Sequence, residues 1–388
     1  MSVHCLKKAD TNRPMNFLLI ASFPESLLVF RGDLLKALQK RGMIVHVAAP
    51  GLLPGSEVLK NIESAGFVAH DILLNRVGMN PLKDLRTVWD LWRLMRDIRP
   101  DAVLGYTIKP VIYGMLSARF AGVRRRFALI TGLGYTFQEP AGQSRKRLLL
   151  RLLVQRLYAF ALKGANSVFF QNPDDQALFK SRQLLCEGAR SMVVNGSGVD
   201  LARYAVSELP PTISFLLIAR LLGDKGVREY VAAARAIRAH HPEIEFKLVG
   251  WIDDNPDAIG SDELDSWVTE GTISFLGRLS DVRPAIAGSS VYVLPSYREG
   301  TPRTVLEAMA MGRAVVTTDA PGCRETVCDQ VNGYLVTVGD SNELAQAMMK
   351  FIRSPGLVKE MGLASRKMAE SKFDVHAVNQ IMIREMGL

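Results

Sequence analysis

Both halves of the 388-residue chain alternate short apolar runs with segments of helical periodicity, and this alternation constrains the fold more than any other feature. Apolar runs bounded by turn residues predict buried strands, and the segments between them predict helices that connect one strand to the next. A strand–helix–strand order of this kind is typical of parallel α/β sheets. The predicted strands are residues 17–21, 43–48, 102–104, 127–130, 167–170, 214–219, 246–249, 273–275, 291–294 and 314–318.

The length of the chain predicts two domains, because a single core rarely grows beyond roughly 250–300 residues. Turn-rich segments divide the alternation near its middle, at Asn195-Gly-Ser-Gly198 and at Pro210-Pro211. We therefore expect one doubly wound, Rossmann-like domain over residues 15–200 and a second over residues 201–388. Ligands of such sheets bind at the carboxyl ends of the strands, so two facing domains predict a cleft between them.

Charge is distributed unevenly between the two halves. Residues 1–200 carry 28 Lys and Arg against 15 Asp and Glu, whereas residues 201–388 carry 20 against 24. This asymmetry indicates that the halves meet different partners. No apolar run is long enough to predict a membrane-spanning helix. The four cysteines indicate a reducing compartment and lack the paired spacing of a zinc site, so we expect no metal there; they are Cys5, Cys186, Cys323 and Cys328.

The most informative segment is Pro295-Ser-Tyr-Arg-Glu-Gly-Thr-Pro-Arg-Thr-Val-Leu-Glu-Ala-Met-Ala-Met-Gly312, in which Glu299 and Glu307 are eight residues apart. A predicted strand leads into a Gly/Pro turn, and a helix follows with Pro302 in its first turn. The free N–H groups and the positive dipole end of such a helix form a site for an anion. One carboxylate lies at the mouth of this site and the other on the helix behind it. This arrangement suits a ligand with a central phosphate and hydroxyls at both ends, such as a nucleotide-sugar.

Each of the two glutamates also has a plainer explanation. Glu307 can be a solvated helix carboxylate that pairs with Arg303 at i,i+4, a contact that contributes only about 0.2–0.5 kcal/mol. Glu299 can be an ordinary polar residue of a turn. For either residue alone we favour the plainer explanation, whereas the pair, spaced around Gly300 and Pro302 and followed by another strand, favours a binding site.

These residues resemble the Glu-x7-Glu signature of retaining glycosyltransferases of family 4. Residues 317–327, Ala219-Arg-Leu-Leu-Gly-Asp-Lys-Gly226 and Leu248-Val-Gly250 are similar to further motifs of that family. The resemblance extends from about Met15 to the C-terminus, and it includes bacterial enzymes that add a hexose or N-acetylhexosamine to polyprenyl-diphosphate-linked sugars. It implies a GT-B fold, with the acceptor on the first domain and the donor on the second. It also implies a last helix, within about residues 370–388, that crosses back to the first domain.

The resemblance implies that the second domain binds the donor, a UDP-sugar, without a resident metal or other cofactor. Arg220 and Lys225 would contact the diphosphate, although their spacing alone is equally well explained by exposed loop cations. Glu307 would accept the ribose hydroxyls, and Glu299 would accept the sugar hydroxyls and shield the developing positive charge. The expected catalytic residues are Glu299, Arg220 and Lys225. The expected donor-binding residues are Arg220, Lys225, Gly250, Arg278, Leu279, Glu299, Gly300, Thr301, Pro302, Arg303, Thr304, Val305 and Glu307.

Two segments of the first half follow predicted strands and should face the cleft, namely Gly105-Tyr-Thr-Ile-Lys-Pro110 and Thr131-Gly-Leu-Gly-Tyr-Thr-Phe137. Their cation, hydroxyls and aromatic rings can hold a phosphorylated, sugar-bearing acceptor, although plain loop packing explains any one of them as well. Many members of the family carry a His near the position of Ile108, and a glycine-rich loop where this chain has residues 22–26. The expected acceptor-binding residues are Tyr106, Thr107, Lys109, Tyr135 and Thr136.

Residues 145–163 predict a long helix with basic residues along one stripe and leucines over a wide face. Such a helix suits the surface of an anionic membrane, and the cluster Arg124-Arg-Arg126 would reinforce it. The alternative is a core-packing helix with a solvated basic face, and the basic balance of residues 1–200 favours membrane contact. We therefore expect a cytoplasmic protein at the inner face of the plasma membrane. The expected membrane-facing residues are Arg124, Arg125, Arg126, Arg145, Lys146, Arg147 and Arg151.

The sequence thus predicts a retaining glycosyltransferase that moves a hexose or N-acetylhexosamine from a UDP-sugar to a polyprenyl-diphosphate-linked saccharide, in the assembly of bacterial surface polysaccharides or glycans. A nucleotide-sugar epimerase of the same fold is the alternative, but Glu-x7-Glu with Arg220 and Lys225 is not the pattern of those enzymes. Nucleic-acid binding would explain the basic composition. However, the basic clusters are interleaved with leucines rather than exposed aromatic residues, so no nucleic-acid partner is expected.

Overall fold

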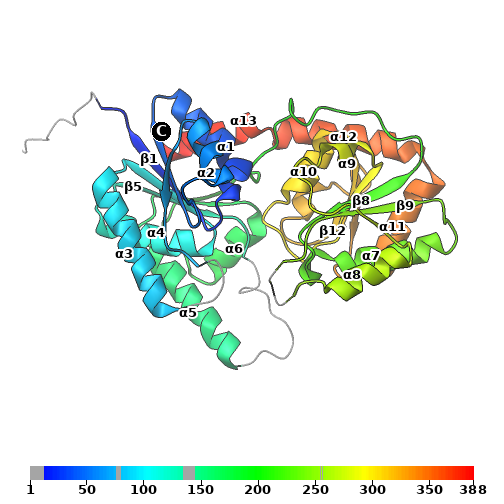
Figure 1. The fold of residues 1–388 in the computed structure, drawn as a ribbon, viewed down its shortest axis with the longest axis horizontal. Helices are drawn as coiled ribbons and strands as arrows, with labels where there is room; N and C mark the ends of the chain where they lie inside the picture. Colours follow the sequence, from blue (N-terminus) through cyan, green and yellow to red (C-terminus); the bar gives the residue numbers. More distant parts are fainter. Residues whose placement is uncertain (1–12, 76–79, 134–144, 254, 256) are drawn as a thin grey trace, which may run out of the picture.

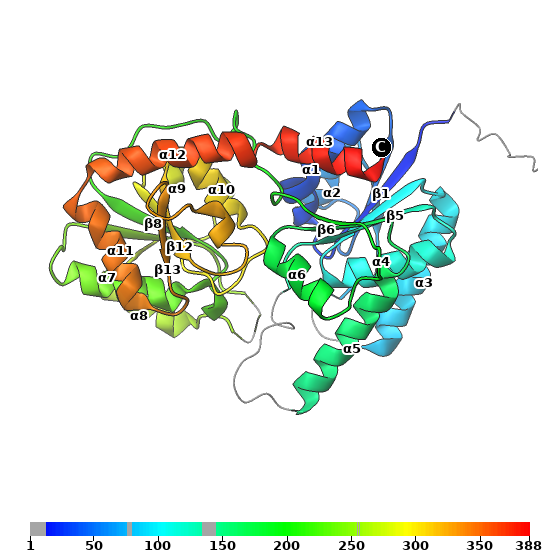
Figure 2. The same cartoon turned by 180° about the vertical axis from the view of Figure 1, so that it is seen from behind.

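The computed structural model describes residues 13–75, 80–133, 145–253, 255 and 257–388, apart from the side chains of residues 145–148 and 150. Two parallel sheets, each with helices on both faces, form two domains that lie side by side (Figure 1, Figure 2). This architecture confirms the prediction of two doubly wound α/β domains. None of the described helices is long and apolar enough to cross a bilayer.

The first sheet has seven strands in the order β3-β2-β1-β4-β5-β6-β7, and every neighbouring pair is parallel. Its strands are β1 Asn16–Ile20, β2 Ile44–Ala49, β3 Val68–Asp71, β4 Ala102–Tyr106, β5 Arg125–Ile130, β6 Ser167–Phe170 and β7 Ser191–Val193. One face is covered by α1 Glu25–Lys40 and α2 Glu57–Ser64. The other is covered by α3 Pro81–Ile98, α4 Ile108–Phe120, α5 Arg145–Leu162 and α6 Pro173–Ser181.

The second sheet has six strands in the order β10-β9-β8-β11-β12-β13, again all parallel. Its strands are β8 Ser214–Ile218, β9 Glu245–Val249, β10 Ser274–Phe275, β11 Val291–Leu294, β12 Ala314–Thr318 and β13 Gly333–Val336. One face packs on α7 Val227–Arg238, α8 Ser261–Thr269 and α11 Ser341–Arg353. The other packs on α9 Arg283–Ala287 and α10 Arg303–Ala310, and α12 Gly356–Lys372 contributes to both cores.

Two segments connect the domains, and they run beside each other. The Val199 N–H donates to the Phe373 carbonyl at 2.8 Å, and the Val375 N–H donates to the Val199 carbonyl at 3.1 Å. Gly198 has a φ of +69°, and a Cβ there would lie 2.5 Å from Val375 Cα. Only glycine therefore allows this close approach of the two connections.

The last helix, α13 Val375–Met386, leaves the second domain and packs on the first (Figure 1). Its side chains Met382, Ile383 and Met386 are buried in the same core as strand β1 and helix α1. The crossing back of the C-terminal helix, which the family resemblance implied, is therefore present.

The sequence predicts the inner strands of both sheets but not β3, β7 or β13, nor the short helix α6. All three of these strands lie at a sheet edge. An edge strand pairs on one side only, so it needs less apolar sequence than a central strand. No residue of β3 or β7 is fully buried, and β13 begins with a glycine. Neither feature gives the apolar run from which the inner strands are predicted.

Candidate functional site between the domains

A cavity of about 660 Å³ lies between the two domains. The first domain contributes residues at or after the ends of β1, β4, β5, β6 and β7, and the second contributes residues at or after the ends of β8, β9, β10 and β11. Parallel sheets bind ligands at this edge because their strand-end loops and helix starts converge there. The cavity is therefore the cleft that the strand order predicts.

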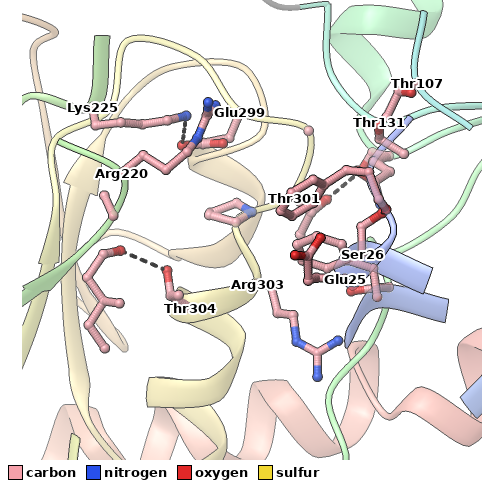
Figure 3. A pocket seen from close by; sticks show the side chains of 18 of the residues that line it. Glu25, Ser26, Thr107, Thr131, Arg220, Lys225, Glu299, Thr301, Arg303 and Thr304 are labelled. Carbon is pink, nitrogen blue, oxygen red and sulfur yellow. Dashed lines mark hydrogen bonds and ion pairs between the residues drawn. The ribbon is translucent and has the colours of Figure 1, made fainter. Parts of the chain in front are cut away.

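Lys225 and Glu299 form an ion pair in the wall of this cavity (Figure 3). Lys225 Nζ lies 2.6 Å from Glu299 Oε1, and the two side chains are 13% and 18% exposed. The Ser296 hydroxyl donates to the same carboxylate oxygen at 2.9 Å. Burial alone lowers the pKa of Lys225, but the charges of Glu299 and Asp224 and the hydrogen bond to Glu299 outweigh it, so the pKa is raised. Lys225 is thus a fixed positive charge at neutral pH.

A tight turn after β8 holds Lys225 in this position. The short 3-10 turn that contains it is followed by Gly226, which has a φ of +70°. A Cβ on Gly226 would lie 2.1 Å from the Pro295 carbonyl oxygen, so glycine is needed where this turn meets the end of β11. The Tyr297 N–H also donates to the Asp224 carbonyl at 2.9 Å. The loop with the cation and the loop with the carboxylate are therefore joined through their backbones.

Arg220 reaches the cavity from the same side (Figure 3). Its Nη1 lies 2.9 Å from Asp253 Oδ2, on the loop after β9, and the two side chains are 32% and 17% exposed. The two cations expected to bind phosphate therefore lie in one cavity, each next to a carboxylate of its own. Among the described residues, no group of three or more His, Cys, Asp or Glu side chains is arranged to hold a metal ion.

The loops after β9 and β10 form another part of the wall. The Arg278 guanidinium carbon lies 4.7 Å from the centroid of the Trp251 ring, and both residues line the cavity. A stacked pair of this kind offers a flat, cationic surface. The other two residues expected here lie behind the wall. A Cβ on Gly250 would lie 2.1 Å from the Ala219 carbonyl oxygen, and Leu279 packs against the core of the second domain.

The start of α10 faces the cavity, as the sequence predicts for an anion site. The helix begins at Arg303, with Pro302 in the N-cap position. The Tyr292 and Thr304 hydroxyls are 2.6 Å apart and fix the first turn to strand β11. The expected donor-binding residues of this segment that line the cavity are Glu299, Gly300, Thr301, Pro302, Arg303 and Thr304.

Glu307 lies behind the cavity instead of in its wall, as does the fully buried Val305. The Glu307 side chain is 7% exposed, and Arg303 Nε donates to its Oε1 at 2.8 Å. The Tyr204 hydroxyl also contacts it: burial first, and then the charge of Glu307 and a hydrogen bond to it, raise the pKa of Tyr204 to about 12. The i,i+4 pairing with Arg303 is therefore present, but with a buried carboxylate instead of a solvated one.

The loop that carries Glu299 also contacts the first domain. Asn172 Nδ2 donates to the Gly300 carbonyl at 2.9 Å and to the Glu299 carbonyl at 3.2 Å. The Thr301 hydroxyl donates to the Gln171 carbonyl at 2.8 Å. A Cβ on Gly300 would lie 2.4 Å from Gln171 Oε1, so this glycine allows the two domains to meet. The loop after β6 thus positions Glu299 from the opposite domain.

Two ion pairs between the domains flank these contacts. Arg298 Nη2 contacts Asp175 Oδ1, and the Asp175 side chain is fully buried. Burial raises the pKa of Asp175, while the charge and hydrogen bond of Arg298 oppose that rise. The second pair, Arg324 Nη1 to Asp174 Oδ2, is 3.0 Å long and lies in a more open position, with side chains 36% and 37% exposed. The buried pair is therefore the one expected to matter for stability.

Two of the residues expected to bind the acceptor lie in the cavity wall. The Tyr106 hydroxyl is 2.6 Å from the Ser26 hydroxyl, and the Thr107 hydroxyl is 2.9 Å from the Ser22 hydroxyl. Tyr106 is nearly fully buried, with its side chain held between β4 and α1. The wall of the first domain therefore offers a set of linked hydroxyl groups.

The other residues expected to bind the acceptor do not line the described cavity. Lys109 Nζ forms an ion pair with Asp84 Oδ1 at 3.1 Å, and both side chains are only 12% exposed. This pair fixes α4 to α3 and leaves Lys109 outside the cavity wall. Tyr135 and Thr136 lie outside the described residues.

Much of the first-domain wall was not predicted from the sequence. The rule that selected residues 105–110, a position directly after a buried strand, applies equally to the residues that follow β1 and β6. Polar side chains at those two positions were the available signal. The lining residues missed in this way are Ser22, Phe23, Glu25, Ser26 and Gln171. Phe30 and Arg31, within α1, and Ser197, after β7, were also missed, whereas Thr131 belongs to the segment that was expected to face the cleft.

The arginines expected to face a membrane differ in their surroundings. Arg126 Nε donates to the Gly164 carbonyl at 2.6 Å, and Arg125 Nη1 donates to the Gly387 carbonyl at 3.2 Å. Both therefore bind the backbone of their own domain, whereas Arg124 is exposed and Arg151 is half-buried. The side chains of Arg145, Lys146 and Arg147 lie outside the described part of the structure.

Comparisons with known proteins agree with this architecture. A family model described as glycosyl transferase 4-like matches residues 18–172, and one described as glycosyl transferases group 1 matches residues 212–354. The chain is 28% identical, over 83% of its length and 85% of the relative, to the N,N'-diacetylbacillosaminyl-diphospho-undecaprenol α-1,3-N-acetylgalactosaminyltransferase of Campylobacter jejuni. It is 24% identical, over 69% of its length and 70% of the relative, to an Escherichia coli UDP-Gal:α-D-GlcNAc-diphosphoundecaprenol α-1,3-galactosyltransferase.

The fold is also that of solved structures. Anabaena Alr3699/HepE in complex with UDP-glucose has a TM-score of 0.73 and 21% identity, with 96% of this chain and 99% of that chain covered. The first model covers most of the first sheet and the second model covers all strands of the second sheet, and residues within both matched ranges line the cavity. The chain therefore belongs to the GT-B glycosyltransferases, with a glycosyl transferase 4-like first domain and a group 1 glycosyl transferase second domain.

Proposed function

We propose that this glycosyltransferase moves a hexose or N-acetylhexosamine from a UDP-sugar to a polyprenyl-diphosphate-linked saccharide, with retention at the anomeric carbon. The observation that carries the proposal is the Lys225–Glu299 pair, which lies with Arg220 and the start of α10 in one cavity between the domains. Such a cavity provides positive charge for a diphosphate beside a carboxylate for sugar hydroxyls. The names of the two relatives support a lipid-linked acceptor, and the UDP-glucose complex supports the donor.

The names of both relatives also specify α linkages in their products. Common UDP-hexoses carry the sugar in α linkage, so an α product from such a donor corresponds to retention. In the proposed site Lys225 and Arg220 bind the diphosphate, and Glu299 accepts hydroxyls of the transferred sugar. Glu307 accepts the ribose hydroxyls once the ligand draws Arg303 away from it. The positive charge that the diphosphate needs comes from these side chains and the start of α10, so the proposal includes no resident metal ion.

The proposed chemistry is a front-face transfer. The acceptor hydroxyl oxygen bonds to the anomeric carbon on the side from which the diphosphate oxygen leaves. The leaving diphosphate oxygen takes the proton of that hydroxyl, so no protein base is required. The protein positions the two substrates and stabilises the charge that develops on the diphosphate. A covalent glycosyl intermediate on Glu299 is the competing mechanism, and a fluorinated donor that leaves a mass shift on the Glu299 peptide would establish it instead.

A transfer assay with a panel of labelled UDP- and GDP-sugars tests the proposal. The acceptor is a short-chain prenyl-diphosphate N-acetylhexosamine, and the anomeric configuration of the product is read by NMR. We expect transfer from a UDP-sugar with retained configuration. Transfer with inversion would contradict the mechanism. Exchange of a sugar C–H proton with solvent, without transfer, would identify the epimerase alternative.

We also propose that the outer faces of α3 and α5 contact an anionic membrane. Both helices pack on the same face of the first sheet (Figure 1, Figure 2). On α3 the apolar residues alternate with the exposed cations Lys83, Arg86, Arg93 and Arg96, a mixture suited to a layer of anionic headgroups over acyl chains. The large apolar side chains exposed on these helices include Leu82, Leu85 and Trp89 on α3, at 81%, 68% and 59%, and Leu149, Leu152 and Leu153 on α5, at 70%, 47% and 47%.

The double variant Leu85→Ser/Trp89→Ser is expected to bind phosphatidylglycerol vesicles at least about tenfold more weakly, because each large apolar side chain buried in lipid contributes roughly 1.5–3 kcal/mol. Flotation measures the bound fraction. The control is Leu363→Ser, an equally apolar side chain that is 51% exposed on α12 of the other domain. Wild-type binding should also fall as salt shortens the Debye length from about 10 Å to about 3 Å. A double variant that floats like the control would place the membrane surface elsewhere.

A further inference from the structure

Arg31 is a buried cation that the proposed donor site does not use. It lies on α1 of the first domain, lines the cavity between the domains and is only 2% exposed. Its Nε and Nη1 atoms are buried and have no hydrogen-bond partner among the described residues. The guanidinium carbon lies 5.8 Å from the centroid of the Tyr106 ring. Arg31 therefore presents unpaired N–H donors at the wall of a cavity large enough for a substrate.

The charges around Arg31 do not neutralise it. Burial lowers the pKa of Arg31 to about 10; among its neighbours the Tyr106 phenol raises the pKa and the cation Arg303 lowers it. Arg303 extends from α10 across the cleft from the helix that carries Glu25 and Ser26 (Figure 3), and its own partner is Glu307. Glu25 lines the same cavity, but no ion pair between it and Arg31 is formed. A buried, unpaired guanidinium next to a second cation destabilises a fold unless an anion joins it.

Arg313 shows how this chain accommodates a buried arginine that has a structural role. It is 1% exposed, and burial lowers its pKa to about 10, as for Arg31. In contrast to Arg31, its guanidinium is saturated by protein oxygens. At 2.7–3.1 Å it donates to the Ser207 hydroxyl and to the carbonyls of Ile286, Ser207, Glu208, Ala287 and Met311.

We infer that Arg31, with Arg303 across the cleft, forms a second anion site that binds a substrate phosphate from the side of the first domain. The inference rests on the proposed function, in which both the donor and the acceptor carry a diphosphate. It differs from the site at Lys225 and Arg220, where each cation already has a carboxylate partner. A guanidinium offers a planar fork of N–H groups that matches two phosphate oxygens. Because Arg31 and Arg303 belong to different domains, a phosphate between them also holds the cleft closed.

The variant Arg31→Met separates this role from a structural one. It removes a buried unpaired charge while it keeps much of the side-chain length. If Arg31 serves an anion site, Arg31→Met without ligand should unfold at the same urea midpoint as the wild type or at a higher one. Calorimetry should show that the variant binds inorganic pyrophosphate at least tenfold more weakly. Arg313→Met is the control, and it should unfold at a lower urea concentration because six oxygen acceptors lose their donor. If Arg31→Met is destabilised like Arg313→Met and binds pyrophosphate as the wild type does, the inference is wrong.

Transfer kinetics then identify which substrate supplies the phosphate. A rise in the KM for the UDP-sugar alone in Arg31→Met assigns the donor diphosphate, and a rise in the KM for the prenyl-diphosphate sugar alone assigns the acceptor diphosphate. If neither KM changes by more than twofold, Arg31 binds neither substrate and the inference fails. If the wild type transfers no sugar from any donor, the proposed function fails instead, and pyrophosphate titration of the wild type and Arg31→Met still decides whether the anion site exists.

Discussion

Lys225→Met is expected to lower kcat about 100- to 1000-fold, because removal of one preorganised donor at a developing negative charge typically has an effect of this size. Lys225 is held 2.6 Å from Glu299 by a glycine-dependent turn, so it requires no reorganisation to meet the leaving diphosphate. The partly buried side chain of Glu299 also loses its partner in this variant. Initial rates at saturating donor and acceptor measure the loss.

The matched control for this prediction is Arg228→Met, three residues farther along the chain. Arg228 binds Glu263 through two contacts of 2.7 and 2.8 Å, but their side chains are 46% and 34% exposed and lie outside the cavity. Exposed pairs contribute only about 0–1 kcal/mol, so kcat should change little. A Lys225→Met enzyme with an unchanged kcat and only a higher KM would mean that Lys225 binds donor and transition state equally, and the catalytic assignment would be withdrawn.

Arg298→Met is expected to reduce the free energy of unfolding by about 3–5 kcal/mol, because it leaves a buried carboxylate without its partner. Asp175 is fully buried in the first turn of α6, and Arg298 reaches it from the other domain. The same substitution removes the ion pair beside the loop that carries Glu299. Urea denaturation measures the loss, and kcat should fall because the cleft no longer closes on a fixed Glu299.

The stability that Arg298→Met loses should depend on pH in a direction set by the pKa of Asp175. The folded-state pKa of Asp175 is raised by burial, with Arg298 opposing the rise, so loss of Arg298 raises the pKa further. A group whose pKa is higher in the folded state than in the unfolded state favours folding as pH decreases towards that pKa. The stability deficit of Arg298→Met should therefore shrink as the pH is lowered from about 7 to about 5.

A second substitution checks whether the unpaired charge of Asp175 causes the loss of stability in Arg298→Met. Asp175→Asn combined with Arg298→Met removes the buried charge together with its partner and should restore part of the lost stability. Arg324→Met is the control, since its pair with Asp174 also connects the domains but is more than one-third exposed. It should change stability by less than about 1 kcal/mol. Equal losses in Arg324→Met and Arg298→Met would show that burial of the pair is not the cause.

Local sequence patterns are sufficient for the inner strands and for the edge strand β10, but not for the edge strands β3, β7 and β13. Val291–Leu294 and Ala314–Thr318 are buried on both faces by helices, so each consists of apolar and β-branched residues, and each was predicted with correct bounds. Val68–Asp71 and Ser191–Val193 contain no fully buried residue. These two segments are strands because they pair with a neighbouring strand of the sheet. Such pairing requires no apolar pattern within the segment itself.

The residues of the candidate site also differ in whether a local sequence pattern predicts them. Glu299, Arg220 and Lys225 follow strands that the sequence predicts, so the rule that ligands bind at strand ends places them in one cleft. Lys109 satisfies the same rule, yet its Nζ pairs with Asp84 on a neighbouring helix and lies outside the cavity wall. Arg31 lies within a helix and gives no strand-end signal, but the packing of α1 brings it to the cavity.

The sequence alone predicts the two parallel α/β domains and the carboxylate and cations of the second-domain wall. It could do so because periodicity and turn residues act over a few neighbouring positions, which any short segment displays. The tertiary structure decided that the predicted Arg303–Glu307 pair is buried and that Arg298 pairs with Asp175 of the other domain. It also decided that Arg31 is buried without a partner. Burial, and the pairing of Arg298 with Asp175 across 123 residues of sequence, depend on segments that meet only in the folded chain, so no local pattern displays them.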